Sequence, residues 1–199
     1  AAVIREAKLA SIMNAYSEID GIPLGASKEL LTDLLRGELG FDGVVVSDYF
    51  TVPTLFSYHH IARDESEAAQ YALEAGIDVE LPALHCYGEP LQQALRAGRV
   101  AMALVDATVS RVLRMKFQLG LFERPYVNPD AARAVFDTAE QRALAHRIAQ
   151  KSIVLLKNDG GLLPLSPTLS RIAVIGPAAD DVRLLQGDYS YPAHLEIIY

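Results

Sequence analysis

The stretch Gly40-Phe41-Asp42-Gly43-Val44-Val45-Val46-Ser47-Asp48-Tyr49 decides the fold class of this chain. Its three consecutive valines show no polar alternation, so both faces of the strand should be covered, as in a parallel sheet flanked by helices. The apolar run ends abruptly at Asp48, where the carboxyl end of a buried strand would hold a carboxylate. Active sites of parallel α/β folds lie at these strand ends. The sequence therefore predicts an α/β fold with an acidic candidate residue at its functional edge.

Two further strand–helix units surround this one at intervals of roughly 30 residues, the length of a parallel crossover connection. A strand is expected at 12–16, followed by a helix that Ser27 caps and Gly40 ends. The strand at 44–47 is expected to lead through a long loop containing His59 and His60 to a helix at 66–75. The third unit has a strand at 76–82 and a helix at 91–97. Three units cannot close a (β/α)8 barrel of about 250 residues, so we expect only the C-terminal part of such a TIM-type barrel.

The domain organisation predicted from the pattern has three parts. Residues 1–120 form the C-terminal part of the barrel and end in an amphipathic helix at 105–119. Residues 121–139 form a linker with few periodic apolar residues. Residues 140–199 begin a second α/β sandwich domain, with a helix at 139–156 and a buried strand at 171–177.

Composition limits the classes of partner. The 199 residues carry a net charge of −7 and have an isoelectric point near 5.2. This balance offers no basic surface for nucleic acid or an anionic membrane, and no apolar run approaches the roughly 20 residues of a membrane span. Cys86 is the single cysteine, which excludes an internal disulfide and a multi-cysteine metal site. We therefore expect a neutral substrate, with no metal and no cofactor.

Four residues at or near predicted strand ends make up the candidate site: Tyr16, Asp48, Tyr49 and Glu80. A carboxylate flanked by aromatic rings suits cleavage of a glycosidic bond, because the anion meets developing positive charge at the sugar carbon while the rings stack on apolar sugar faces. Structural roles compete with this interpretation. Asp48 could cap a helix or form an ion pair at a strand end, and Glu80 could anchor a loop or form an ion pair.

Short motifs in a consistent order extend over nearly the whole chain, and together they resemble glycoside hydrolase family 3. They are Met13-Asn14-Ala15-Tyr16, Asp20-Gly21-Ile22-Pro23, Leu34-Leu35-Arg36, Glu38-Leu39-Gly40-Phe41, Gly43-Val44-Val45-Val46-Ser47-Asp48, Ala75-Gly76-Ile77-Asp78, Arg111-Val112-Leu113, Lys116-Phe117-Gln118-Leu119-Gly120-Leu121-Phe122 and Ser152-Ile153-Val154-Leu155-Leu156-Lys157-Asn158. The order of so many fragments makes a chance match improbable. A further segment, Gly187-Asp188-Tyr189-Ser190-Tyr191, resembles a loop of the family's second domain that approaches the active-site mouth.

The resemblance implies roles for individual residues. Asp48 matches the retaining nucleophile of the family's Ser-Asp-Trp motif, and Tyr16 matches a tyrosine that holds nucleophile and substrate. Tyr49 stands where the family usually has Trp, which keeps a ring but alters the grip on the sugar. Asp20 replaces a common Asn in a turn that tolerates either residue.

The function implied by the resemblance is a retaining exo-β-glycosidase that removes terminal β-linked glucose or xylose from oligosaccharides or glycosides, with a carbohydrate substrate as partner. The acid/base of such enzymes is a Glu expected downstream of Tyr199. Two alternatives stay open. One is a family 3 β-N-acetylhexosaminidase, and the other is an isolated chain that is inert or only binds carbohydrate. A homo-oligomer of the full-length enzyme also stays open.

Overall fold

The computed structural model describes residues 1–187 and 190–191. The chain divides into two units, Ala1–Pro129 and Asp130–Tyr199. The first unit contains the predicted strand–helix repeats, and all four residues of the candidate site lie in it.

A small parallel sheet forms the centre of the first unit. Strand β1 (Ser11–Met13) pairs in parallel with β4 (Val44–Val46), so that Ile12 lies opposite Val45. On the other side of β4, Val46 forms a parallel bridge with Val79. Val44 and Val45 are fully buried, which confirms the covered parallel sheet of an α/β fold. The strand predicted at 76–82 is reduced to this bridge among the described residues.

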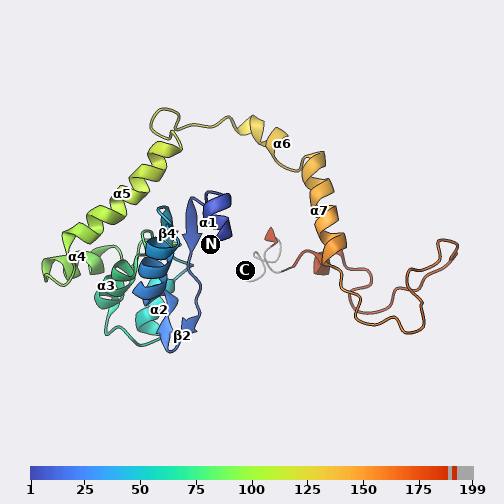
Figure 1. The fold of residues 1–199 in the computed structure, drawn as a ribbon, viewed down its shortest axis with the longest axis horizontal. Helices are drawn as coiled ribbons and strands as arrows, with labels where there is room; N and C mark the ends of the chain where they lie inside the picture. Colours follow the sequence, from blue (N-terminus) through green and yellow to red (C-terminus); the bar gives the residue numbers. More distant parts are fainter. Residues whose placement is uncertain (188–189, 192–199) are drawn as a thin grey trace. The chain divides into compact units, whose positions relative to one another are not determined.

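Helices cover the sheet, and several of them follow the predicted units (Figure 1). Helix α3 (Glu65–Ala75) packs against both α2 (Thr51–Ser57) and α4 (Glu89–Arg96), and their buried side chains join Val45 and Ile77 in one apolar core. Residues Glu18–Ile19 (β2) and Ile22–Pro23 (β3) form a short antiparallel hairpin. The helical elements of this unit are α1 (Ala2–Glu6), η1 (Leu24–Ala26), η2 (Glu29–Glu38), α2 (Thr51–Ser57), α3 (Glu65–Ala75), α4 (Glu89–Arg96) and α5 (Met102–Gln118).

The helix expected after Ser27 is present, but it is a π-helix. Ser27 Oγ accepts a hydrogen bond from Leu30 N at 3.3 Å, in agreement with its predicted capping role. Gly40 ends the segment with a φ of +71°, a left-handed conformation that glycine adopts without steric cost. Leu31 and Leu35 are the buried side chains of this helix, so the apolar spacing correctly identified the helix and its buried face. The sequence pattern did not distinguish a π-helix from an α-helix.

The long loop predicted after Asp48 is wrong, because α2 occupies much of it. Pro53 lies in the first turn of this helix, where a missing N–H group costs no intrahelical hydrogen bond. Val52 and Leu55 are fully buried, so packing against the core stabilises a helix that is too short to be recognised by its period.

The second unit contains α6 (Ala132–Val135) and α7 (Ala139–Ser152), besides the 3-10 turns η3 (Pro129–Ala131) and η4 (Val182–Leu185). Thr138 and Gln141 form a reciprocal capping box at the start of α7. The strand predicted at 171–177 does not form, and Ile172, Val174 and Ile175 are exposed. A strand exists only when a neighbour accepts its hydrogen bonds, and none of the described residues supplies one here.

A buried carboxylate ties the sheet to two helices. Asp78 Oδ2 accepts hydrogen bonds from Arg36 Nη2 of η2 at 2.7 Å and from Val45 N of β4 at 2.8 Å. Its Oδ1 accepts from Arg111 Nε of α5 at 2.7 Å. Burial lowers the pKa of Arg36, and the charge of Asp78 opposes that shift. We call Arg36, Asp78 and Arg111 the arginine–aspartate triad.

Candidate active site

Asp48 lies directly beyond the carboxyl end of β4. Ser47, which precedes it, is fully buried and donates its backbone N–H to Val79 O at 2.8 Å. Ser47 Oγ in turn accepts a hydrogen bond from Leu81 N at 2.8 Å. These bonds fix the backbone immediately before the half-buried Asp48. The Asp48 Oδ1 accepts the N–H of Tyr49 at 2.7 Å.

Asn14 joins the end of β1 to the backbone of Asp48. Its side chain is 5 % exposed, and its Oδ1 accepts the N–H of Asp48 at 3.2 Å. Its Nδ2 donates to Ala15 O at 2.8 Å. The sequence interpretation missed this contact because it placed Asn14 inside a strand. The available signal was an amide side chain within the residues of a predicted strand.

Tyr16 and Tyr49 lie together beside Asp48. The Tyr16 hydroxyl donates a hydrogen bond to Tyr49 O at 2.7 Å, across 33 residues of sequence. Both residues are about half exposed, 50 % for Tyr16 and 55 % for Tyr49. The arrangement groups a carboxylate with two accessible aromatic side chains at one edge of the sheet.

Phe50, which the sequence interpretation did not select, adds a third exposed ring. The residue is 55 % exposed, and its ring lies edge-on to that of Tyr49, with 6.4 Å between the ring centres. Its backbone has a φ of 62°, an unusual left-handed conformation for a bulky residue. A single sequence cannot reveal this conformation, since Gly or Asn is the usual signal for it.

Glu80 anchors the loop that follows the third parallel segment. Its Oε2 accepts the N–H groups of His85 and Tyr87 at 3.0 and 2.8 Å, and its Oε1 accepts that of Cys86 at 2.9 Å. The side chain is thus engaged with backbone, in the manner of a loop anchor, and substrate binding by Glu80 stays a prediction. Burial, with the Glu80 charge adjoining, raises the pKa of the Cys86 thiol, which disfavours a reactive thiolate.

The segment after Glu80 is joined to the Asp48 segment through the backbone. Phe50 N donates to Leu81 O at 3.0 Å, in addition to the bond between Leu81 and Ser47. Three segments that follow parallel strands, 14–16, 48–50 and 80–81, therefore meet at one edge. The carboxyl ends of parallel strands are where α/β folds assemble their sites.

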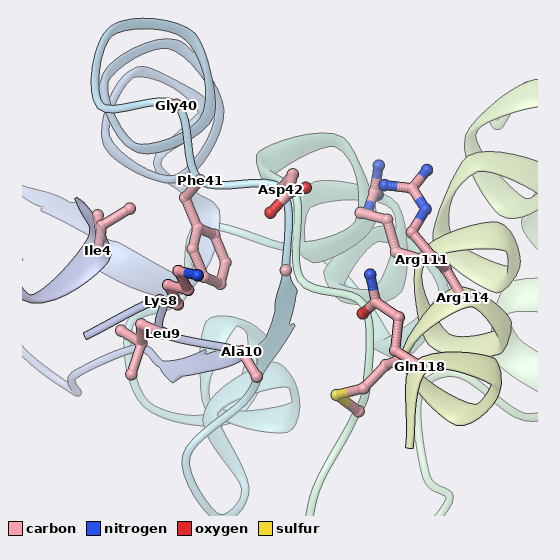
Figure 2. Close-up of a pocket in the computed structure, with 12 residues that line it drawn as sticks. Ile4, Lys8, Leu9, Ala10, Gly40, Phe41, Asp42, Arg111, Arg114 and Gln118 are labelled. Atoms are coloured by element: carbon pink, nitrogen blue, oxygen red, sulfur yellow. The ribbon is translucent and has the colours of Figure 1, made fainter. Parts of the chain in front are cut away.

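A separate cleft of about 300 Å³ lies at the opposite end of β4, beside Gly43. Figure 2 shows Asp42 facing Arg111 and Arg114 of α5, with Lys8, Leu9 and Phe41 on the other side. Residues at the amino-terminal ends of parallel strands generally serve stability, and Arg111 belongs to the arginine–aspartate triad. We therefore place the candidate site at Asp48 and not in this cleft.

Within 1–187 and 190–191, no group of three or more His, Cys, Asp or Glu side chains could hold a metal ion. No helix in that part of the chain combines the length and apolar character needed to cross a membrane. Of the predicted loop at 187–191, Asp188 and Tyr189 lie outside the described residues.

Comparison with known proteins identifies the family. The model of the glycosyl hydrolase family 3 N terminal domain matches residues 1–115, more than half of the chain. The chain belongs to glycosyl hydrolase family 3. The model of the family 3 C-terminal domain matches residues 153–198, so both family domains are represented.

Curated family 3 relatives match almost the whole chain. A lysosomal beta glucosidase of Dictyostelium discoideum is 39% identical over 195 residues, which are 96% of this chain and 24% of the relative. A beta-xylosidase of Formosa agariphila is 38% identical over 197 residues, 94% of this chain and 27% of the relative. The chain spans about a quarter of the length of the relatives it matches.

Solved structures of family 3 enzymes share the fold. A β-glucosidase from Erythrobacter marinus superposes with a TM-score of 0.72 at 41% identity, covering 82% of this chain and 22% of the other. A mutant β-glucosidase from Listeria innocua in complex with laminaribiose gives a TM-score of 0.71 at 38% identity, covering 81% of this chain and 22% of the other. These matches support an α/β fold of the family 3 type.

Proposed function

We propose that this chain carries the nucleophile of a retaining exo-β-glycosidase, with Asp48 as that nucleophile. The observation that carries the proposal is the placement of the Asp48 carboxylate beyond the end of β4, at the edge where the segments of Tyr16 and Leu81 meet. The family's named relatives include beta-glucosidases and beta-xylosidases, so the substrate class is terminal β-linked glucose or xylose.

The proposed reaction has two displacements. The Asp48 carboxylate attacks the anomeric carbon, the bond to the leaving oxygen breaks, and a general acid gives that oxygen a proton. Water then attacks the anomeric carbon of the glycosyl-enzyme and loses a proton to the same group acting as base, while the bond from that carbon to the Asp48 carboxylate breaks. The sugar retains its anomeric configuration because two inversions cancel.

The side chains around Asp48 have positioning roles in this proposal. Asn14 and the backbone of Tyr49 fix the position of the Asp48 main chain and of its Oδ1. Tyr16 holds the Tyr49 carbonyl, and its half-exposed ring is available to a sugar. Glu80 is proposed to act through the loop it anchors as well as through direct substrate contact.

We propose that these residues act within a longer polypeptide. The parallel segments at β1, β4 and Val79 would be the C-terminal part of a (β/α)8 barrel covering 1–120, followed by a linker at 121–139 and the start of a sandwich domain at 140–199. The matched fraction of the relatives, about a quarter, supports this arrangement. The general acid/base is then a carboxyl group of the second domain, and turnover requires both Asp48 and this group.

The test replaces Asp48 by alanine in the full-length protein and measures hydrolysis of an aryl β-glucoside and an aryl β-xyloside. We expect kcat to fall by at least about a thousandfold, as for loss of a covalent nucleophile. Azide should restore release of the aryl alcohol by attacking the anomeric carbon from the vacated side.

The matched control is Asp42→Ala, which removes an exposed carboxylate from the other end of β4. Its activity should stay within about threefold of the parent. Activity of Asp48→Ala within tenfold of the parent would remove Asp48 from the nucleophile role.

A further inference from the structure

Phe50 combines an exposed apolar ring with a strained backbone two residues after Asp48. The residue is 55 % exposed, and φ is 62° with ψ of 10°. A bulky residue in this conformation costs roughly 1–2 kcal/mol relative to glycine. Neither feature favours folding, since exposure leaves the ring's apolar surface in water.

Hydrogen bonds from three segments hold Phe50 in this conformation. Its N–H donates to Leu81 O at 3.0 Å, and its carbonyl accepts from Thr54 N at 3.1 Å. The preceding carbonyl, that of Tyr49, accepts the hydroxyl of Tyr16 at 2.7 Å. Strained residues persist where the surrounding structure determines their geometry in this way, and they concentrate at functional sites.

The chemistry of the ring indicates what it contacts. Phenylalanine has no hydrogen-bonding group with which to select sugar hydroxyls, but its face can stack on the apolar face of a sugar or an aryl group. An exo-acting enzyme encloses one terminal sugar, so the rest of the substrate extends from the leaving-group side. An exposed aromatic residue two positions after the proposed nucleophile suits that outer part of the substrate.

We propose that Phe50 is a specificity-determining residue whose ring stacks on the leaving group, the second sugar or an aryl aglycone. This inference rests on the proposed function of Asp48. It predicts that substrates with a ring in the leaving group gain affinity from Phe50, whereas substrates with a small aliphatic leaving group do not.

The experiment compares cellobiose with methyl β-glucoside in the full-length protein, using Phe50→Asn. Asparagine tolerates the left-handed conformation, so the backbone can stay in place while the ring is lost. We expect kcat/KM for cellobiose to fall about tenfold, mainly through KM, and that for methyl β-glucoside to stay within about twofold. Phe50→Tyr keeps an aromatic ring, so its kcat/KM for cellobiose should stay close to that of the parent.

Stability is the second readout. Because the substitution relieves backbone strain and removes exposed apolar surface, the thermal midpoint of Phe50→Asn should equal or exceed that of the parent. The control is Tyr58→Asn, which removes a 74 % exposed ring at the end of α2 where φ is −119°. It should leave the ratio of the two kcat/KM values unchanged.

The outcomes separate this inference from the proposed function. Equal losses on both substrates, no loss on either, or a lowered thermal midpoint would overturn the role of Phe50 and leave Asp48 untouched. A midpoint that falls would indicate that the ring packs against another part of the full-length protein. If the parent hydrolyses neither glucoside, or Asp48→Ala retains activity, the proposed function fails, and the role of Phe50 fails with it.

Discussion

Replacement of Asp78 by asparagine is the substitution that should most damage the framework beneath the candidate site. The Asp78 side chain is fully buried and accepts hydrogen bonds from two guanidinium groups and one backbone N–H. Arg36 and Arg111 are themselves only 14% and 21% exposed. Asparagine keeps the shape of Asp78 but removes the buried negative charge that both guanidinium groups contact, and it turns a donor toward one of them.

The expected loss is about 3–5 kcal/mol of unfolding free energy, the usual cost of removing one partner from a buried ion pair. Domains of this size are stable by about 5–15 kcal/mol in total, so the variant should be close to unfolding. The same position connects β4, η2 and α5, and the damage should therefore extend to Asp48 through the sheet.

Amide hydrogen exchange of Ile77 measures this loss locally in the 199-residue chain. The Ile77 residue is fully buried, and its N–H is bonded to Ala72 O at 3.1 Å, so exchange reports opening of the first unit. The control is Glu89→Gln, which breaks an exposed pair with Arg96 at 2.9 Å and should cost less than about 1 kcal/mol. A loss for Asp78→Asn within 1 kcal/mol of that control would refute a stabilising role for the triad.

Two further predictions concern stability. Contacts with Arg63 hold the pKa of Glu67 at about 2. Because this pKa is depressed, the stabilisation is present above about pH 4.5 and is lost as the pH falls toward 2. The unfolding midpoint of Glu67→Gln should therefore depend less on pH between about 4.5 and 2 than that of the parent, and an unchanged pH profile would disprove this role. Gly43→Ala should destabilise by about 1–3 kcal/mol in urea unfolding, because the added Cβ would collide with Ala10 O and lie 2.7 Å from the Phe41 ring. Gly37→Ala should stabilise by about 0.5–1 kcal/mol, because its added Cβ would make an ordinary contact with Thr32 O at 3.8 Å. Equal effects of the two substitutions would contradict this packing.

The sequence predicted the parallel sheet well because its signal is local. The valines at 44–46 and the terminators Gly40 and Gly76 depend only on neighbouring residues, and the structure confirms β4 and both helix ends. The helix α2 was missed because burial of Leu55, a tertiary effect, stabilises it against Pro53 and its short length.

The candidate site was predictable in part. Strand ends select Asp48, and the topology brings the segment of Tyr16 to it. Asn14 and Phe50 were missed because their importance depends on a hydrogen bond across 34 residues and on a backbone angle that phenylalanine rarely adopts. The strand predicted at 171–177 does not form because its apolar run indicates only a β-strand propensity, whereas a strand also requires a neighbouring strand to pair with.

The most direct test of the account is to trap the glycosyl-enzyme. The full-length protein would be inactivated with a fluorinated aryl β-glycoside, which slows hydrolysis of the intermediate, and the labelled peptide would be sequenced by mass spectrometry. We predict one fluoroglycosyl group per inactivated molecule, esterified to Asp48. Inactivation with the label on any other carboxylate would contradict it.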